Sequence, residues 1–457
     1  MDFDVVVVGG RCAGSPLAAL LAREGARVAV VEKATFPADT LSTHIFQAAG
    51  INFLRRLGVL DQVVAAGSEP MTQLDFRRGD FFAKEPYALR PGDVGFNLSV
   101  RRSILDAMLA DAAAEAGAEV MMATTVTGLL HEGGRASGVR VRTGGTERAI
   151  TARLVVGADG RSSTVGTLAG SRKYHVVPSE RFAYWGFFEG ATPPSPATAV
   201  YHLWDGRCVI AGPSDSGLYE VVLVPDRRFL PEFRADRERA FMEHARACAP
   251  VATALEGATR VGKLQGTLQW ESYFRESVGE GWVLVGDAGH FKDPTPGQGM
   301  TDAFRQSAAL APAILRGLAG SDADLDTAMT EWARWRDHDA FEQHWLCCDT
   351  GEAGPGPAVL PEMFRRAQRG GYMGEFYDLF QHRARPSRVA TPIRAVAGTA
   401  ALAARRGADR PRLLRELRGL VSNEAQRQRL RRNPVYVEPA KSPGARESAV
   451  ETAGASA

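Results

Sequence analysis

Three short clusters in the chain combine glycine with a carboxylate, and each follows an apolar run typical of a buried strand. They are Gly9–Gly14 with Glu32, Asp159-Gly160, and Gly286-Asp287. Glycine lets a backbone turn sharply beside an anionic ligand. A carboxylate can accept hydrogen bonds from a sugar-like polyol. None of the clusters is a complete nucleotide fold, so together they predict three edges of one nucleotide site in a discontinuous domain.

The N-terminal cluster has the spacing of a dinucleotide fingerprint. The expected elements are a strand over Val5–Val8, a tight turn over Gly9–Gly14, a helix over Pro16–Glu24 and a strand over Arg27–Val31 that ends in Glu32. An acidic residue about 20 positions after the glycines is placed to meet a ribose hydroxyl. The alternative is a purely structural βαβ unit.

One residue departs from the G-x-G-x-x-G pattern. Arg11 stands where the second glycine lets the backbone approach a pyrophosphate. Its side chain must therefore turn away from the ligand or place its guanidinium on the phosphates. Gly9 is expected to supply the sharp turn, and Gly14 to let the helix pack close to the strand.

The third cluster begins with a strand over Val283–Val285 and ends in a helix that is expected to start near Thr301. The turn between them contains Pro294, Pro296, Gly297 and Gly299. A helix that follows a glycine-rich loop directs its free backbone N–H groups toward an anionic ligand.

These clusters and the residue composition of the segments between them predict an α/β protein. A Rossmann-like nucleotide-binding domain is expected in three parts, residues 1–70, 98–172 and 281–345. A mostly antiparallel β-sheet domain is expected from residues 71–97 and 173–280, where short strands such as Phe182–Phe188 and Tyr219–Val224 are rich in aromatic and β-branched residues. A helical region over 346–440 and a disordered tail over 441–457 complete the expected order.

Composition excludes several classes of protein. The 457 residues carry a net charge of +2, which gives no electrostatic reason for a nucleic-acid partner. The five cysteines are odd in number and lack CxxC spacing, so neither a structural metal nor a disulfide framework is expected. No apolar run approaches the ~18 residues of a spanning helix, and no secretory leader is recognised. We expect a cytoplasmic protein; the oligomeric state stays open.

Arginines accumulate in the predicted C-terminal helices, among them Arg405, Arg406, Arg415, Arg429 and Arg432. Two interpretations remain: a solvated helical face, or a contact with an anionic surface.

With these residues in place, the chain resembles the flavoprotein aromatic hydroxylase superfamily, which includes monooxygenases, flavin-dependent halogenases and geranylgeranyl-reductase-like enzymes. The resemblance covers roughly residues 3–340 and lies in the order of the three motifs. It implies bound FAD, with NADPH or NADH as a transient electron donor. The first cluster would serve the ADP half, Asp159-Gly160 the pyrophosphate, and Gly286-Asp287 the ribityl chain and ring.

The resemblance also implies a set of FAD-contacting residues. They are Gly9, Gly10, Arg11, Cys12, Ala13, Gly14, Glu32, Lys33, Arg102, Asp159, Gly160, Gly286, Asp287, Pro294, Gly297, Gly299 and Met300. Besides Arg11, the departures are Gly166, where an arginine often closes the second motif, and Thr301, where asparagine is common.

No paired carboxylates or Ser/His/Asp constellation stands out, as expected when a cofactor carries the chemistry. Catalytic residues stay unassigned, and His44, His202 and His290 are interpreted as structural. The favoured function is an NAD(P)H- and oxygen-dependent monooxygenase that hydroxylates or epoxidises a small organic substrate. A reductase or halogenase of the same fold is the alternative, although no tryptophan pair forms the W-x-W-x-x-P halogenase signature. A non-catalytic nucleotide-binding protein is the third class.

Overall fold

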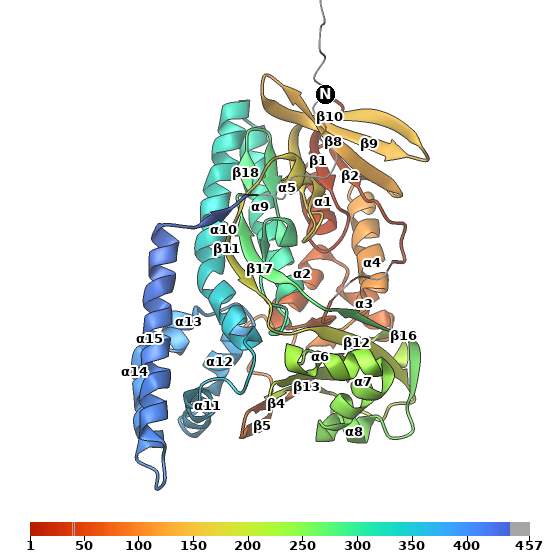
Figure 1. Cartoon of the computed structure of the whole chain (residues 1–457). Coiled ribbons are helices and arrows are strands. Elements are labelled where there is room, and N and C mark those ends of the chain that lie inside the picture. Colours follow the sequence, from red (N-terminus) through yellow and green to blue (C-terminus); the bar gives the residue numbers. More distant parts are fainter. Residues whose placement is uncertain (39, 41, 439–457) are drawn as a thin grey trace, which may run out of the picture.

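A computed structural model describes residues 1–38, 40 and 42–438. The predicted tail over 441–457 lies outside the described residues. Two large sheets, each covered by helices, and a C-terminal group of helices make up the molecule (Figure 1). This arrangement confirms the predicted fold class.

The first sheet carries the three glycine clusters. Its main path runs in the order β18 (Val278–Gly279), β19 (Trp282–Leu284), β10 (Thr146–Gly157), β1 (Phe3–Val8), β2 (Val28–Val31) and β7 (Glu119–Met121). Strands β8 (Thr124–Glu132) and β9 (Arg135–Thr143) extend it as an antiparallel layer on β10.

Parallel pairing fixes where the clusters lie. Val8 of β1 pairs with Gly157 of β10, and Gly157 pairs with Leu284 of β19. The three strands therefore end in register, and the segments that follow them leave the sheet at one edge. Strand β2 lies on the other side of β1, which places Glu32 and Asp287 on opposite sides of that strand.

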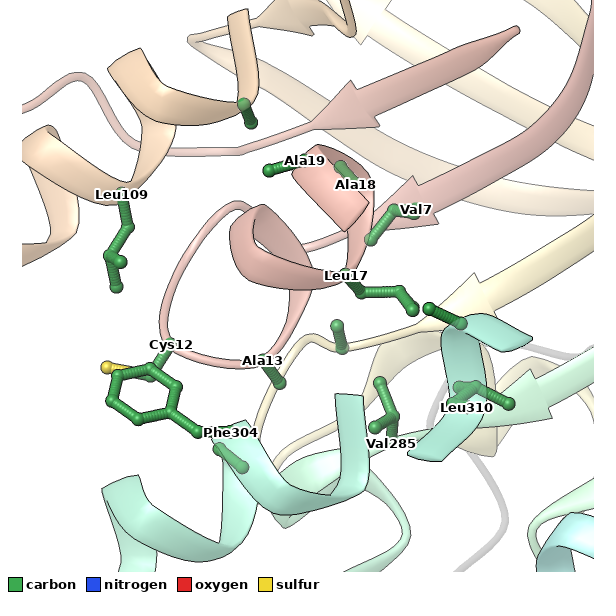
Figure 2. Packing of buried hydrophobic residues seen from close by; sticks show 14 of the residues in the cluster. Val7, Cys12, Ala13, Leu17, Ala18, Ala19, Leu109, Val285, Phe304 and Leu310 are labelled. Carbon is green, nitrogen blue, oxygen red and sulfur yellow. The ribbon is translucent and has the colours of Figure 1, made fainter. Parts of the chain in front are cut away.

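Helices bury one face of this sheet. They are α1 (Gly14–Arg23), α2 (Ala48–Leu57), α3 (Leu60–Ala65), α4 (Arg102–Glu115) and α9 (Gly299–Leu318). Leu17 of α1 packs in one cluster with Val7, Val285 and Leu310 (Figure 2). Helix α4 starts at Arg102, and the preceding Leu98–Ser99 pair as strand β6 with β3 (Ile45–Phe46).

The second sheet is mostly antiparallel. Its order is β16 (Thr259–Thr267), β12 (Ala183–Glu189), β15 (Tyr219–Leu223), β14 (Arg207–Pro213), β13 (Thr198–Trp204), β4 (Gln73–Arg78) and β5 (Phe81–Pro86). Residues 73–86 thus join strands from far along the chain, with β4 parallel to β13. Alternation along β12 places Phe188 against α7 (Arg237–Arg246) and Trp185 on the opposite face. Helices α6 (Leu230–Ala235) and α8 (Ala249–Ala254) complete that cover.

A four-stranded sheet and the C-terminal helices join the two domains. The sheet order is β20 (His290–Phe291), β17 (Glu271–Arg275), β11 (Lys173–Pro178) and β21 (Tyr436–Val437). The helices are α10 (Asp322–Gly351), α11 (Val359–Arg369), α12 (Met373–Phe380), α13 (Pro386–Val389), α14 (Pro392–Ala403) and α15 (Arg410–Arg432), with the short α5 (Thr164–Leu168) near β10. Among the described residues, no helix is long and apolar enough to cross a membrane.

Pro361 lies in the first turn of α11, where proline's missing N–H removes no helical hydrogen bond. Several of the arginines bind carboxylates: Arg427 contacts Asp349, and Arg405 contacts Glu362. These pairs tie α15 and its approach to the rest of the protein.

Leu17→Ala tests the packing of α1. Leu17 has no exposed surface, and its truncation is expected to lower the free energy of unfolding by about 2–5 kcal/mol. Chemical denaturation of the FAD-loaded protein measures the change. The control Ile393→Ala, at a side chain that is 81% exposed, should stay within about 0.5 kcal/mol of the parent. Equal effects of the two substitutions would contradict the packing described.

Candidate active site

The predicted clusters meet in one cleft of about 500 Å³ at the carboxyl edge of the first sheet. The predicted residues that line it are Gly9, Arg11, Cys12, Ala13, Glu32, Lys33, Arg102, Asp159, Gly160, Asp287, Pro294, Gly297, Gly299 and Met300. Three predicted glycines, Gly10, Gly14 and Gly286, lie behind this lining. Their contacts with FAD stay a prediction, and their positions indicate that they shape the backbone.

The first turn requires glycine at two positions. Gly9 has a φ of 99°, and a Cβ on Gly14 would lie 1.8 Å from the Gly9 carbonyl oxygen. Only glycine fits there. The backbone N–H of Gly10 donates to Glu32 Oε2 over 2.8 Å, and the N–H of Ala34 donates to Glu32 Oε1 over 3.0 Å. Glu32 therefore holds its own loop in place, a role that the fingerprint alone does not predict.

The guanidinium of Arg11, a residue that lines the cleft, binds a carboxylate of the protein. Its guanidinium donates to Asp106 Oδ2 over 2.7 Å, and Asp106 also accepts two hydrogen bonds from Arg102. Asp106 is fully buried at one side of the cleft. A carboxylate on α4 thus holds the arginine that stands in place of the second glycine.

The carboxylate of Asp159 is also used within the chain. It accepts from Ser163 Oγ over 2.6 Å and from the backbone N–H groups of Thr164 and Val165 at the start of α5. Burial raises the pKa of Asp159, and these hydrogen bonds oppose the rise. The space beside Gly166 is filled by Arg275, since a Cβ on Gly166 would lie 2.2 Å from Arg275 Nη1. Arg275 of β17 thus lies beside Gly166, the position where the family often has an arginine.

Asp287 lies at the end of the cleft farthest from β2. Burial raises its pKa to about 6, while Arg161 and Arg102 act in the opposite direction. The backbone is fixed nearby: Tyr273 Oη donates to the Asp287 carbonyl, and the Gly286 N–H donates to Gln306 Oε1 of α9. The side-chain carboxylate faces the cleft and could accept the hydroxyls of a polyol chain.

Helix α9 begins at Gly299, two residues earlier than expected, and Gly299 and Met300 line the cleft. The positive end of its dipole faces this space. Behind it, Lys292 Nζ lies 2.6 Å from Asp302 Oδ2, and His382 Nδ1 lies 2.8 Å from Asp302 Oδ1. Burial alone would raise the pKa of Asp302, but Lys292 and His382 hold it well below its usual range.

A separate apolar pocket of about 60 Å³ adjoins the cleft. Thr43 and Gly297 line both. Its walls come from the second sheet, including Phe76 of β4 and Tyr201 of β13, and from α12, including Phe380. No residue of Phe182–Phe188 lines this pocket, because Trp185 and Phe187 pack in the adjoining core with Tyr273 and Phe291.

Sequence reasoning missed several residues that line the cleft. They are Ser42, Thr43, Thr124, Thr125, Val126 and Arg161. Arg161 directly follows Asp159-Gly160, which was a usable signal. The threonines belong to no motif, and only the fold brings them to the cleft.

Each of the three histidines named from the sequence contacts another titratable side chain, and their structural role stays a prediction. His290 lies 3.3 Å from His344 in a fully enclosed site, where burial, then His344 and Arg336, lower the pKa of His290. His44 is paired with Glu220 and His202 with Asp75.

The fold and this cleft define an FAD-binding flavoprotein. Residues 2–336 match the family described as FAD binding domain, and the chain belongs to that family. It is therefore an FAD-dependent enzyme of a group of monooxygenases and related oxidoreductases.

The relatives within this group differ in chemistry. The chain is 30% identical to 6-methylpretetramide 4-monooxygenase of Streptomyces rimosus over 333 residues, which cover 70% of this chain and 77% of that protein. It is 28% identical to digeranylgeranylglycerophospholipid reductase of Methanosarcina acetivorans, over 73% of this chain and 81% of the reductase. Among solved structures, the flavin-dependent brominase Bmp2 matches with a TM-score of 0.71 at 19% identity, covering 93% of this chain and 100% of Bmp2, which supports the fold alone.

The residues of the cleft suit FAD. Glu32 lies at one end of the cleft and Asp287 at the other, on opposite sides of β1. The N-terminus of α9 and the glycine-rich turns also line the cleft, where they suit an anionic ligand. We propose that the adenosine end lies by Glu32 and the ring end by Gly297–Met300.

The pH dependence of FAD affinity tests the assignment of Asp287. With a pKa near 6, its carboxyl is protonated below that pH before FAD binds. Ribityl hydroxyls prefer the ionised carboxylate and lower its pKa, so binding should release a proton. Affinity should therefore rise as the pH increases through about 6 and become constant above it, as measured by equilibrium dialysis of apoprotein with FAD.

Asp287→Asn should remove this pH dependence and weaken binding near neutral pH by about 1–3 kcal/mol. Asp61→Asn, on an exposed part of α3, is the matched control and should behave like the parent. A parent affinity that is independent of pH between mildly acidic and neutral solution would contradict the assignment.

Proposed function

We propose that this protein is an FAD-dependent monooxygenase that uses NAD(P)H and oxygen to hydroxylate or epoxidise a small organic substrate. The overall reaction consumes one NAD(P)H, one O₂ and one proton per substrate, and yields the oxygenated product, NAD(P)⁺ and water. The observation that carries the proposal is the apolar pocket that meets the FAD cleft at Thr43 and Gly297.

Exclusion of water supports this function. Oxygen transfer from a reduced flavin to a substrate requires a site from which water is kept away. The pocket is walled by Leu74, Phe76, Val200 and Ile210 of the second sheet, and Phe380 of α12 adds an apolar side chain. A substrate in this pocket would lie next to the end of the cleft where we place the flavin ring.

The protein's own residues would bind and orient rather than react. Bound FAD would supply the redox chemistry, by accepting a hydride and then activating oxygen. The N-terminus of α9 would stabilise negative charge that develops on the ring. Asp302 stays ionised because Lys292 and His382 lower its pKa, so this network keeps a fixed charge distribution beneath the helix start.

The electron donor would bind transiently. The described sequence contains a single βαβ fingerprint, at Gly9–Gly14, and FAD would occupy it. NADH or NADPH would therefore reach the flavin from the open cleft.

A reductase is the alternative, because digeranylgeranylglycerophospholipid reductase matches 73% of this chain at 28% identity. The two functions differ in what happens to oxygen. A reductase passes hydride from flavin to substrate, so it forms product without oxygen.

Turnover with and without oxygen therefore tests the proposal. With a true substrate, aerobic turnover should consume oxygen and place one atom from labelled O₂ in the product, as detected by mass spectrometry. Anaerobic samples should stop after the flavin is reduced once. Continued anaerobic formation of a product without new oxygen would replace the monooxygenase proposal with the reductase.

A further inference from the structure

The apolar pocket contains polar atoms that its own walls leave without partners. Gln47 Oε1, Asn97 Oδ1, Tyr377 Oη and Gln381 Oε1 are each buried and form no hydrogen bond with the described residues. All four side chains line the pocket. A buried polar atom without a partner costs about 1–3 kcal/mol, so a set of them in one pocket indicates a ligand that completes them.

A neighbouring tyrosine shows the contrast. Tyr201 also lines the pocket, but its hydroxyl donates to the Thr295 carbonyl over 3.0 Å. Its hydrogen-bonding capacity is thus used by the protein. Tyr377 is 4% exposed and has no such partner.

The chemistry of these atoms selects a kind of ligand. Three amide oxygens can accept hydrogen bonds. Burial, then Glu85, raise the pKa of Tyr377, so its phenol stays neutral. None of the described residues that line the pocket carries a charged side chain. A carboxylate or a phosphate would lose its hydration there without a counter-charge. An uncharged ligand with hydrogen-bond donors suits the pocket.

The shape of the pocket favours a flat ring. Phe76, Tyr201 and Phe380 pack against one another, with ring centroids 6.0–6.1 Å apart, and form one aromatic wall of the pocket on which a flat ring can stack. A cavity of about 60 Å³ holds only a few water-sized spheres, which is the scale of one ring rather than several.

The segment that carries Tyr377 and Gln381 lies beyond residues 2–336, the part that matches the family. It is nevertheless bound to the loop before α9, which contains Pro294 and Gly297 of the cleft. Gln298 Nε2 donates to the carbonyls of Leu379 and Phe380, over 3.1 and 2.9 Å. His382, the next residue after Gln381, is bound to Asp302 in the first turn of α9. The C-terminal end of α12 is thus held in one position relative to the cleft.

We propose that Tyr377 and Gln381 at the end of α12, together with Gln47, form a substrate-specificity site for an uncharged aromatic ring that bears two or more hydrogen-bond donors. This inference rests on the proposed function for its statement that the pocket holds the substrate. It assigns the choice of substrate to a part of the chain outside the family-matched domain.

A panel of one-ring probes tests the site in the FAD-loaded protein. Catechol, phenol, toluene and benzoate have similar sizes and differ in donors and charge. Isothermal titration calorimetry should show that catechol binds more tightly than phenol, and phenol more tightly than toluene, by about 2–10-fold for each donor. Benzoate should bind most weakly.

Two variants locate the effect. Gln381→Met and Tyr377→Phe should each reduce the preference of catechol over toluene by about 2–10-fold, while toluene affinity and FAD content stay unchanged. Gln368→Met, at an exposed glutamine of α11 that bonds Glu85, is the matched control and should keep the full preference.

The inference is overturned if toluene or benzoate binds as tightly as catechol, if catechol does not bind at millimolar concentration, or if both variants retain the parent's preference. These outcomes concern binding alone. A reductase that shows the expected order of affinities would remove the proposed monooxygenase function and leave the specificity site in place.

Discussion

The parallel register of β1, β10 and β19 is the constraint on which the site depends. Because Val8, Gly157 and Leu284 are aligned across the sheet, segments separated by more than a hundred residues leave it at one edge. Apolar strands buried by helices on one side and by β8 and β9 on the other hold that register. A one-residue slip in β19 would move Asp287 along the edge and turn its strand's side chains to the other face.

The second determinant is the attachment of the C-terminal helices to this edge. Gln298 and Asp302 belong to the loop and first turn that would contact the flavin, and both bind residues 379–382. The pocket is therefore closed by a segment whose position depends on the cofactor loop. Buried hydrogen bonds thus connect the loop before α9 to the end of α12, and the pairing of Lys292 with Asp302 lies beside them.

The sequence was sufficient for the fold class and for most of the cleft lining, because glycines and carboxylates after apolar strands carry a local signal. It left the direction of Arg11 open, since its partner Asp106 lies 95 residues away on α4. It could not decide which strands of the second sheet line the pocket, because alternation shows that a strand has two faces without showing which of them meets a cavity. Tyr377 and Gln381 had no motif at all, and only long-range packing of α12 on the flavin loop brings them to the site.

The most direct test of this account is an experimental structure of the protein with FAD. The account predicts that the adenosine ribose lies by Glu32 and that the isoalloxazine ring lies by Thr43, Gly297 and Met300, with one face toward the apolar pocket. A ring that lies at the Glu32 end, or that is separated from the pocket by protein side chains, would contradict it.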